Sequence, residues 1–250
     1  MKYDVIIIGA GIAGLTAAIY AARAGKKVLV LEGKVYGGQI INTLSIENWP
    51  GDFGVSGVDL ITKIKNQAEE LGAEIELEEV EKVEKVGNEF KITTEDDEYT
   101  ADNVVLAVGA EPRKLSDKQI KEAGSRAISY CATCDGALYK GKPVVVVGSG
   151  NTAKDEIKYL ENIASKVYNI HHDEDIPEDA AAIFVAIGRV PSTGFLNGIV
   201  DLDEKGYIVA GEDCKTSCPG IFAIGDCRTK SVRQLVTAAG DAAVAIAAIV

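Results

Sequence analysis

The chain has 250 residues, of which 47% are hydrophobic and 26 are glycine, a composition typical of a compact α/β protein with many tight turns. Its formal net charge of −12 at pH 7 argues against nucleic acid and against an anionic membrane surface as partners, because both require a basic footprint. The acidic start, Met1 to Asp4, lacks the pattern of a signal peptide, and no apolar run approaches the length needed to span a bilayer. We therefore expect a cytoplasmic protein.

A strand, a glycine-rich turn and a helix follow one another at the start of the chain. Tyr3 to Ile8 is a β-branched run that predicts a buried strand, and Gly9 to Gly14 has the glycine spacing of a dinucleotide-binding turn. A helix is predicted over Leu15 to Ala24 and a second strand over Lys27 to Leu31. Glu32 ends that strand about twenty residues after the turn, where a dinucleotide fold places its ribose-binding acid. The pattern predicts nucleotide binding; the alternative is a merely tight turn.

The following segment changes from a helical to an extended pattern. We expect an amphipathic helix over Asp59 to Leu71, strands within Glu74 to Thr94 and over Glu98 to Thr100, and a buried strand over Asp102 to Ala110. The pattern breaks at residues 111–113, Glu-Pro-Arg, which predicts a linker.

Two cysteines separated by two residues lie in the segment Cys131 to Gly136, which reads Cys-Ala-Thr-Cys-Asp-Gly. Such a pair can cycle between a dithiol and a disulfide, and a helix start or a nearby positive charge can hold one cysteine as the thiolate. The alternatives are two buried thiols, or half of a structural zinc site whose other ligands would be Cys214 and Cys218. No residue pattern besides the cysteines requires a metal, so we predict redox chemistry and no metal.

A second strand, glycine turn and helix begin after the cysteines. Ala153 occupies the third glycine position of this turn, which the dinucleotide pattern permits. The predicted elements are a strand over Pro143 to Val147, the turn Gly148 to Ala153, a helix over Lys154 to Asn162, strands over Lys166 to Ile170 and Ala182 to Ile187, and a second linker at residues 188–191.

The last part of the chain completes an α/β fold. Strands are predicted over Tyr207 to Val209 and Ile221 to Ile224, a turn at Gly225-Asp226, and an apolar helix over Leu235 to Ile249. That helix is too short to span a membrane, so we expect it in the core or at a dimer contact. The two linkers predict two Rossmann-like domains of the three-layer ββα type: a discontinuous domain of residues 1–113 and 189–250, and a smaller inserted domain of residues 114–188 that carries the cysteine pair.

The order of six motifs resembles that of the low-molecular-weight thioredoxin reductases, and the resemblance covers almost the whole chain. The motifs are Gly9 to Gly14, Gly37-Gly38-Gln39, Glu47 to Gly51, Cys131 to Gly136, Gly148 to Ala153 and Gly225-Asp226. The resemblance implies a homodimeric flavoprotein that has an FAD domain, split in sequence, and an inserted pyridine-nucleotide-type domain with the redox-active cysteines.

The same resemblance implies how the discontinuous domain binds FAD. The pyrophosphate would lie against the turn and the start of the following helix, where amides and the helix dipole favour an anion. Glu32 would bind the adenosine ribose, Asp226 would lie on the ribitol or pyrophosphate side, and Arg233 would lie near the isoalloxazine rather than being a solvated surface residue. The full set of implied FAD contacts is Gly9, Gly11, Ala13, Gly14, Glu32, Gly38, Gln39, Asn48, Ala110, Gly225, Asp226, Arg233 and Gln234.

In the inserted domain the resemblance implies three catalytic residues. Cys134 would receive electrons from the flavin, Cys131 would attack the disulfide of thioredoxin, and Asp135 would relay protons. A helix-capping role for Asp135 is the alternative, and both roles can coexist. Cys214, Cys218 and Cys227 match no motif, so we expect buried or incidental thiols, and we expect His171 and His172 to be solvated.

The chain departs from the NADPH-using members in one region. Those members have a His-Arg-Arg-type cluster that holds the 2′-phosphate, whereas the chain here has His171-His172-Asp173-Glu174-Asp175, and carboxylates repel phosphate. Only about thirty residues separate Ala153 from Phe184, too few for a complete nucleotide half-domain. We therefore expect a degenerate NADPH site.

With that departure, the resemblance is strongest to the ferredoxin-dependent flavin thioredoxin reductases, whose NADPH-type domain is shortened. It implies electron flow from reduced ferredoxin through FAD and Cys134/Cys131 to thioredoxin, because a flavin can accept electrons singly and release them in pairs. The alternatives are the same chemistry with NAD(P)H or a deazaflavin as donor, or a flavin redox sensor without turnover.

Overall fold

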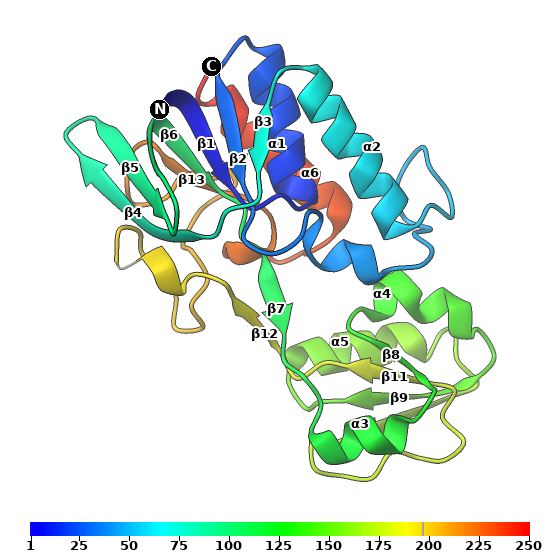
Figure 1. Ribbon diagram of the computed structural model, residues 1–250. Helices are drawn as coiled ribbons and strands as arrows, with labels where there is room; N and C mark the ends of the chain where they lie inside the picture. Colours follow the sequence, from blue (N-terminus) through cyan, green and yellow to red (C-terminus); the bar gives the residue numbers. More distant parts are fainter. Residues whose placement is uncertain (197) are drawn as a thin grey trace. The chain divides into compact units, whose positions relative to one another are not determined.

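The computed structural model describes residues 1–196 and 198–250, which divide into two compact units (Figure 1). Unit 1 comprises Met1–Glu111 and Pro191–Val250, and unit 2 comprises Pro112–Val190. The chain passes between the units in β7 (Ala110–Pro112) and β12 (Arg189–Pro191), which pair as a two-stranded sheet. These crossings lie at the two segments where the sequence pattern breaks.

A five-stranded parallel sheet forms the centre of unit 1. Its order is β3 (Glu74–Glu76), β2 (Val28–Leu31), β1 (Lys2–Ile8), β6 (Glu98–Leu106) and β13 (Ile221–Ala223). Strands of a parallel sheet that are buried on both faces have continuous apolar sequences, and those of β1, β2 and the second half of β6 are of this kind. The carboxyl ends of these strands form the edge at which the glycine turn lies.

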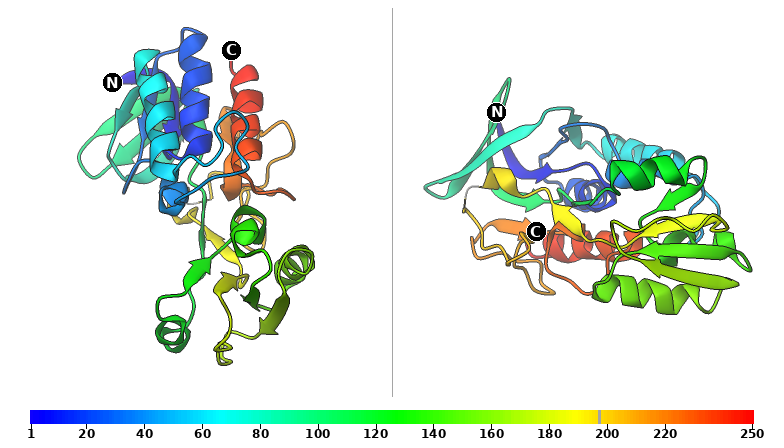
Figure 2. Two further views of the ribbon diagram at one scale, coloured as in Figure 1. Left: turned by 90° about the vertical axis from the view of Figure 1, so that its right-hand side faces the viewer. Right: turned by 90° about the horizontal axis from the view of Figure 1, so that it is seen from below.

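Different elements cover the two faces of this sheet, which gives three layers. The helices α1 (Ile12–Arg23), α2 (Gly57–Glu70) and α6 (Leu235–Ala247) pack on one face and lie side by side (Figure 2, left). The antiparallel strands β4 (Val80–Val86) and β5 (Glu89–Thr94) pack on the other face. Because β5 pairs with the first half of β6 and β13 with the second half, the sheet divides at β6.

Unit 2 is a smaller α/β unit with four parallel strands. The strand order is β10 (Lys166–Ile170), β9 (Pro143–Val147), β11 (Ala182–Val185) and β8 (Ala127–Ser129). The helices α4 (Ala132–Asp135) and α5 (Asn151–Leu160) pack on one face, and α3 (Asp117–Ala123) together with the loop around Ile176 packs on the other. The fold is therefore the expected α/β, Rossmann-like class. The second β layer of the expected ββα arrangement is formed by β4 and β5 in unit 1, whereas helices and a loop cover the two faces of the sheet in unit 2.

Short 3-10 helices complete both units: η1 (Gly38–Asn42), η2 (Gly136–Tyr139), η3 (Gly194–Leu196) and η4 (Gly225–Cys227). Within the described residues, no helix has the length and apolarity needed to cross a membrane.

Several expected boundaries were wrong for identifiable reasons. The helix expected from Asp59 begins at Gly57, because the Ser56 hydroxyl accepts a hydrogen bond from the Asp59 amide at 3.1 Å. The strand expected over Asp102 to Ala110 ends at Leu106 and is continuous with the one expected over Glu98 to Thr100. Tyr207 to Val209 is not a strand, because Ile208 makes only isolated bridges with Leu202 and Arg228.

Candidate active site

The glycine turn between β1 and α1 brings two segments of backbone into contact that side chains would separate. A Cβ on Gly14 would lie 1.8 Å from the carbonyl oxygen of Gly9, and a Cβ on Gly9 would lie 2.5 Å from that of Ala107. Gly9 also has φ +107°, a conformation that favours glycine. By contrast, a Cβ on Gly11, the N-cap of α1, would have no neighbour closer than 3.8 Å. The backbone is therefore tightly packed at Gly9 and Gly14, whereas there is space beside Gly11 at the start of the helix.

Glu32 follows β2 and its carboxylate lies at the same turn. Its Oε2 accepts a hydrogen bond from the Ala10 amide at 2.9 Å, and its Oε1 accepts one from the Lys34 amide at 3.2 Å. Ala10 is the residue between Gly9 and Gly11, so the acid and the glycine turn form one local site. This is the arrangement that the spacing of the sequence predicts.

Two hydrogen bonds join other residues of the predicted FAD set in pairs. The Gln39 amide nitrogen donates to the Ala110 carbonyl at 2.7 Å, and the Asn48 amide nitrogen donates to Gln234 Oε1 at 3.1 Å. Gly38 and Gln39 begin η1, Ala110 begins β7, and Gln234 is the N-cap of α6. Residues up to 186 positions apart in the sequence are thus brought together in unit 1.

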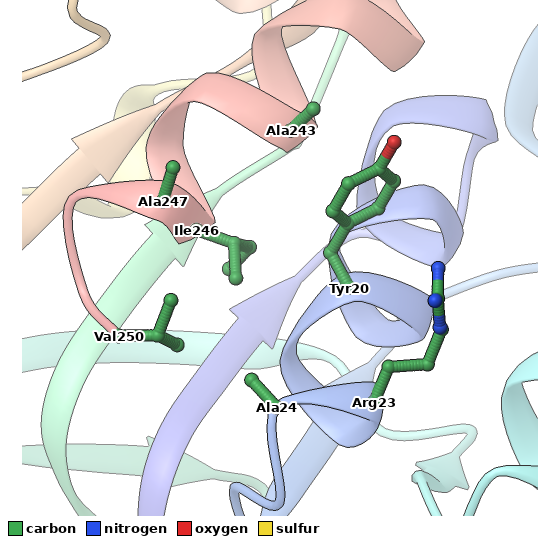
Figure 3. A pocket seen from close by; sticks show the side chains of 7 residues that line it. All are labelled: Tyr20, Arg23, Ala24, Ala243, Ile246, Ala247 and Val250. Carbon is green, nitrogen blue, oxygen red and sulfur yellow. The ribbon is translucent and has the colours of Figure 1, made fainter.

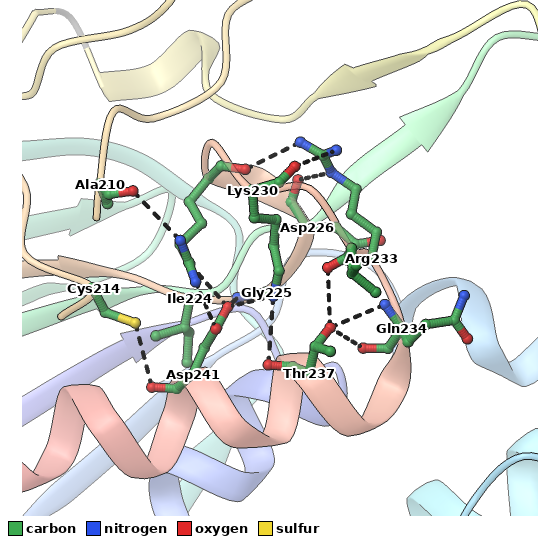
Figure 4. A network of polar contacts seen from close by, with 12 residues as sticks. Ala210, Cys214, Ile224, Gly225, Asp226, Lys230, Arg233, Gln234, Thr237 and Asp241 are labelled. Atoms are coloured by element: carbon green, nitrogen blue, oxygen red, sulfur yellow. Dashed lines mark hydrogen bonds and ion pairs between the residues drawn. The ribbon is translucent and has the colours of Figure 1, made fainter. Parts of the chain in front are cut away.

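The Gly225-Asp226 turn lies against the start of α1. A Cβ on Gly225 would lie 3.1 Å from the Cβ of Ala13, so this turn packs directly on the first turn of the helix. The Arg233 guanidinium donates to the carbonyl oxygens of Asp226, Arg228 and Lys230 at 3.1–3.3 Å (Figure 4). It also lies 4.3 Å from the centre of the Tyr207 ring. Arg233 is therefore a half-buried residue that organises the segment after the turn, and not a solvated one.

A buried ion cluster around Asp241 supports this turn, and sequence reasoning missed it. Asp241 Oδ2 accepts hydrogen bonds from the Gly225 amide at 2.9 Å and from Lys230 Nζ at 2.8 Å, and Oδ1 accepts one from Arg228 at 2.8 Å (Figure 4). Burial raises the pKa of this carboxyl, but the hydrogen bonds from Arg228, Lys230 and Gly225 outweigh burial and lower the pKa overall. A charge-rich segment followed by an alanine-rich helix gives little signal for such a cluster.

The cysteine pair lies at the start of α4 in unit 2. Cys131 and Cys134 form a disulfide with their Cα atoms 5.3 Å apart, and Cys131 is the N-cap of the helix. Asp135 is the last residue of α4, and its Oδ2 accepts a hydrogen bond of 2.6 Å from the Ser129 hydroxyl. The Ser129 hydroxyl also accepts one from the Cys131 amide at 3.2 Å. Asp135 is thus linked to the dithiol turn through Ser129 and does not cap the start of the helix.

The second glycine turn connects β9 to α5, but its surroundings differ from those of the first. Asn169, near the end of β10, donates a hydrogen bond to the Gly148 carbonyl at 2.8 Å. Beyond β10, the Glu174 carboxylate accepts a hydrogen bond from the His171 amide at 2.7 Å. Residues 171–181 contain no helix, so β10 continues to β11 through a loop.

The three remaining cysteines are free thiols that differ in burial. Cys214 and Cys227 are buried, and burial raises the pKa of their thiols to about 11 and about 12 respectively. Cys218 is partly exposed. Among the described residues, no group of His, Cys, Asp and Glu side chains could hold a metal ion.

A shallow apolar groove of about 290 Å³ lies elsewhere in unit 1, between α1 and α6 (Figure 3). Its lining residues are Tyr20, Arg23, Ala24, Ala243, Ile246, Ala247 and Val250. None of them belongs to the predicted FAD or dithiol sites.

The residues of unit 1 fit a dinucleotide such as FAD. Gly11 leaves open space in front of the helix start, and an ionisable acid ends the second strand beside it. A side chain at Gly9 or Gly14 would close the turn, so the close approach depends on glycine.

Comparison with known proteins identifies the class. A family model described as pyridine nucleotide-disulphide oxidoreductase matches residues 3–179 and 172–243, so the chain belongs to that family. Within it, the chain is one of the low-molecular-weight thioredoxin reductases, which are flavoproteins with FAD as their cofactor. A thioredoxin reductase of Listeria innocua is 38% identical over 292 aligned positions, covering 97% of the chain and 91% of the relative.

Solved structures agree with this membership. The thioredoxin reductase of Streptococcus pyogenes is 33% identical with a TM-score of 0.92, covering 99% of the chain and 97% of that structure. A ferredoxin-flavin thioredoxin reductase of Clostridium acetobutylicum is 28% identical with a TM-score of 0.64, covering 100% and 96%. The comparisons therefore establish the thioredoxin reductase family and do not single out its ferredoxin-dependent subclass.

Proposed function

We propose that the chain reduces the disulfide of thioredoxin with electrons from ferredoxin, and that NADPH is not its donor. When bound, FAD would supply the conversion of single electrons into pairs. The observation that carries the proposal is the acidic loop after β10. There the Glu174 carboxylate accepts a hydrogen bond from the His171 amide at 2.7 Å. Binding of a 2′-phosphate would require arginines in this segment.

This loop is built into unit 2 by a buried side chain. Gln119 on α3 is fully buried, and its amide nitrogen donates to the carbonyl oxygens of His171 and Glu174 at 3.2 and 3.0 Å. Lys118, also on α3, forms an ion pair with Asp175, the next residue of the loop. A phosphate would have to replace contacts that already satisfy these groups, and it would also meet the exposed carboxylate of Asp173.

The lengths of the alignments support a shortened nucleotide domain. The alignment with the Listeria innocua protein spans 292 positions, whereas the chain has 250 residues, so at least 42 positions of the relative have no counterpart here. The family model matches in two segments that meet at residues 172–179, within the acidic loop. The alignment length indicates a deletion relative to that protein, and the division of the family match supports its placement after β10.

For the FAD site we propose the residues of unit 1 that the hydrogen bonds above bring together. The first turn of α1, with Gly11 at its N-cap, would bind the pyrophosphate, and Glu32 would exchange its Ala10 amide contact for the ribose hydroxyls. The Gly225-Asp226 turn would lie on the ribitol or pyrophosphate side, with the Gln39–Ala110 and Asn48–Gln234 pairs and Arg233 along the flavin.

For the dithiol site we propose that Cys134 receives electrons, that Cys131 attacks thioredoxin, and that Asp135 transfers protons. The Ser129 hydroxyl contacts both Asp135 and the Cys131 amide, so it holds the carboxylate at the dithiol turn, which supports this role of Asp135. We also propose that the protein is a cytoplasmic homodimer in which residues 114–188 form the shortened pyridine-nucleotide-type domain and residues 1–113 and 189–250 form the FAD domain.

Anaerobic thioredoxin reduction tests the proposed donor. The FAD-loaded protein would receive oxidised thioredoxin together with either photoreduced ferredoxin or NADPH, and free thiols on thioredoxin would be counted. We expect thiol formation with ferredoxin and none above the protein-free blank with NADPH. Efficient reduction by NADPH would contradict the proposal, and the membership of the family would stand.

A further inference from the structure

A buried carboxylate on α5 contacts the dithiol turn without having a role in the chemistry described above. Glu156 accepts a hydrogen bond from the amide of Ala132, the residue directly after Cys131. Its Oε2 is buried and has no hydrogen-bond partner within the part of the chain that the structure describes. Buried polar atoms normally have a partner, so an unpaired carboxylate oxygen here calls for an explanation.

The packing of α5 fixes this contact. Gly136, at the end of the dithiol motif, lies against α5, and a Cβ there would meet Leu160 Cδ2 at 3.0 Å and Tyr159 Cε1 at 3.2 Å. Ala132 is fully buried and shares its apolar cluster with Leu160 and Ala153 of α5. The dithiol turn and the helix that carries Glu156 are therefore one packed block.

Burial raises the pKa of Glu156 to about 7, although the Ala132 amide and the charge of Arg189 both oppose the rise. Arg189 is itself bonded to the Tyr130 carbonyl at 3.3 Å. On the dithiol side, Asp135 accepts a hydrogen bond from Ser129, and the pKa of Tyr139 is raised by burial and by Asp135. The other titratable side chains of α5 are the exposed Lys154, Asp155 and Lys158 and the half-buried Tyr159. At neutral pH, Glu156 can thus exchange a proton next to the dithiol.

We propose that Glu156 is a positioning residue of the dithiol, which holds the Ala132 amide and, when ionised, disfavours the thiolate form of the reduced cysteines. A carboxylate and a thiolate in the same low-dielectric block repel each other, so they compete for one negative charge. When one thiol loses its proton, Glu156 takes one up, and the charge of the site is conserved. This inference concerns the dithiol alone and does not depend on which donor reduces the flavin.

The reactivity of the reduced cysteines with iodoacetamide measures their thiolate fraction directly. The FAD-loaded full chain is first reduced anaerobically with dithiothreitol, which gives two electrons and two protons to the disulfide and becomes a cyclic disulfide. After removal of dithiothreitol, alkylation rates of the peptide that contains Cys131 and Cys134 are followed by mass spectrometry from pH 5.5 to 9. Cys214 and Cys227 serve as internal references, because their raised pKa values make them slow.

We expect the wild-type rate to rise in two steps, with a break near the pKa of Glu156. In the Glu156→Gln variant, which keeps an acceptor for Ala132, we expect a single titration and on the order of tenfold faster alkylation at pH 7. The matched control is Glu161→Gln, an exposed residue at the end of the same helix, which should behave as wild type.

Two results would overturn the proposal. One is a single-step wild-type curve, which needs no variant to be interpreted. The other is a folded Glu156→Gln protein whose curve coincides with those of wild type and Glu161→Gln.

Discussion

The amide of Gly225 donates a hydrogen bond of 2.9 Å to the buried carboxylate of Asp241. Gly225 belongs to the turn that packs against Ala13 at the start of α1, and Asp241 lies in α6, so this bond fixes the turn to the helix behind it. Arg228 and Lys230 bind the same carboxylate, so two buried cations share one buried anion behind this turn.

Replacing Asp241 with asparagine should destabilise the protein strongly, because it leaves Arg228 buried without a counter-charge. We expect a loss of about 3–5 kcal/mol in the free energy of unfolding, measured by denaturant titration. Since the pKa of Asp241 is lowered in the fold, its contribution is present at neutral pH and disappears on acidification through that lowered pKa. Asp213→Asn, which breaks an exposed ion pair with Lys215, should change little. Equal effects of the two substitutions would contradict the role of the cluster.

The glycine turn allows flavin binding to be separated from folding. A methyl group on Gly11 meets no protein atom within 3.4 Å, so Gly11→Ala should fold normally but bind FAD about tenfold more weakly or worse, ~1.4 kcal/mol. Gly14→Ala should instead lose the fold, because its Cβ would lie 1.8 Å from the Gly9 carbonyl oxygen. Gly240→Ala in α6 meets open space and should gain about 0.5–1 kcal/mol. Flavin absorbance and thermal unfolding provide both readouts, and full FAD binding by Gly11→Ala would place the pyrophosphate elsewhere.

Serine at either member of the disulfide should abolish thioredoxin reduction while leaving reduction of the flavin by its donor intact. Each cysteine is needed because one must attack the substrate and the other must resolve the mixed disulfide. Cys218→Ser, which alters a partly exposed free thiol, is the control and should keep full activity. Retention of thioredoxin reduction by both Cys131→Ser and Cys134→Ser would refute the dithiol mechanism.

The stability of the oxidised protein should decrease with rising pH because of Glu156. Its pKa in the fold, about 7, is above its ordinary value of 4.5. The contribution of Glu156 to the free energy of unfolding is therefore fully present below pH 4.5 and is lost as the pH rises through 7. The difference in unfolding free energy between wild type and Glu156→Gln should therefore shift by roughly 3 kcal/mol over that range, in the direction that disfavours wild type at high pH. A pH-independent difference would show that Glu156 does not titrate with the proposed pKa.

Local signals in the sequence predicted the elements that they encode directly. The strand Pro143–Val147 was located to the residue, because five consecutive apolar or β-branched residues are bounded by polar residues and a glycine turn. The β1–α1 turn and Glu32 were found because the spacing of a dinucleotide site is fixed by the backbone contact that it makes.

Short elements and tertiary contacts could not be predicted in the same way. The helices α3 and α4 and the strand β8 were missed, since three to seven residues are too few to show a hydrophobic period. Glu156 and Asp241 carry no signal in the sequence either. Glu156 looks like one of several charged residues of a surface helix, and only packing against α4 buries its carboxylate.

The identity of the electron donor is the central claim, and anaerobic visible spectroscopy of the FAD-loaded protein tests it most directly. One sample would receive NADPH and a second would receive photoreduced ferredoxin, and the visible absorbance of the oxidised flavin would be followed in both. The acidic loop held by Gln119 predicts rapid bleaching by ferredoxin and no bleaching by NADPH on the same time scale. Rapid bleaching by NADPH would contradict the proposed donor and would show that unit 2 still binds the nucleotide.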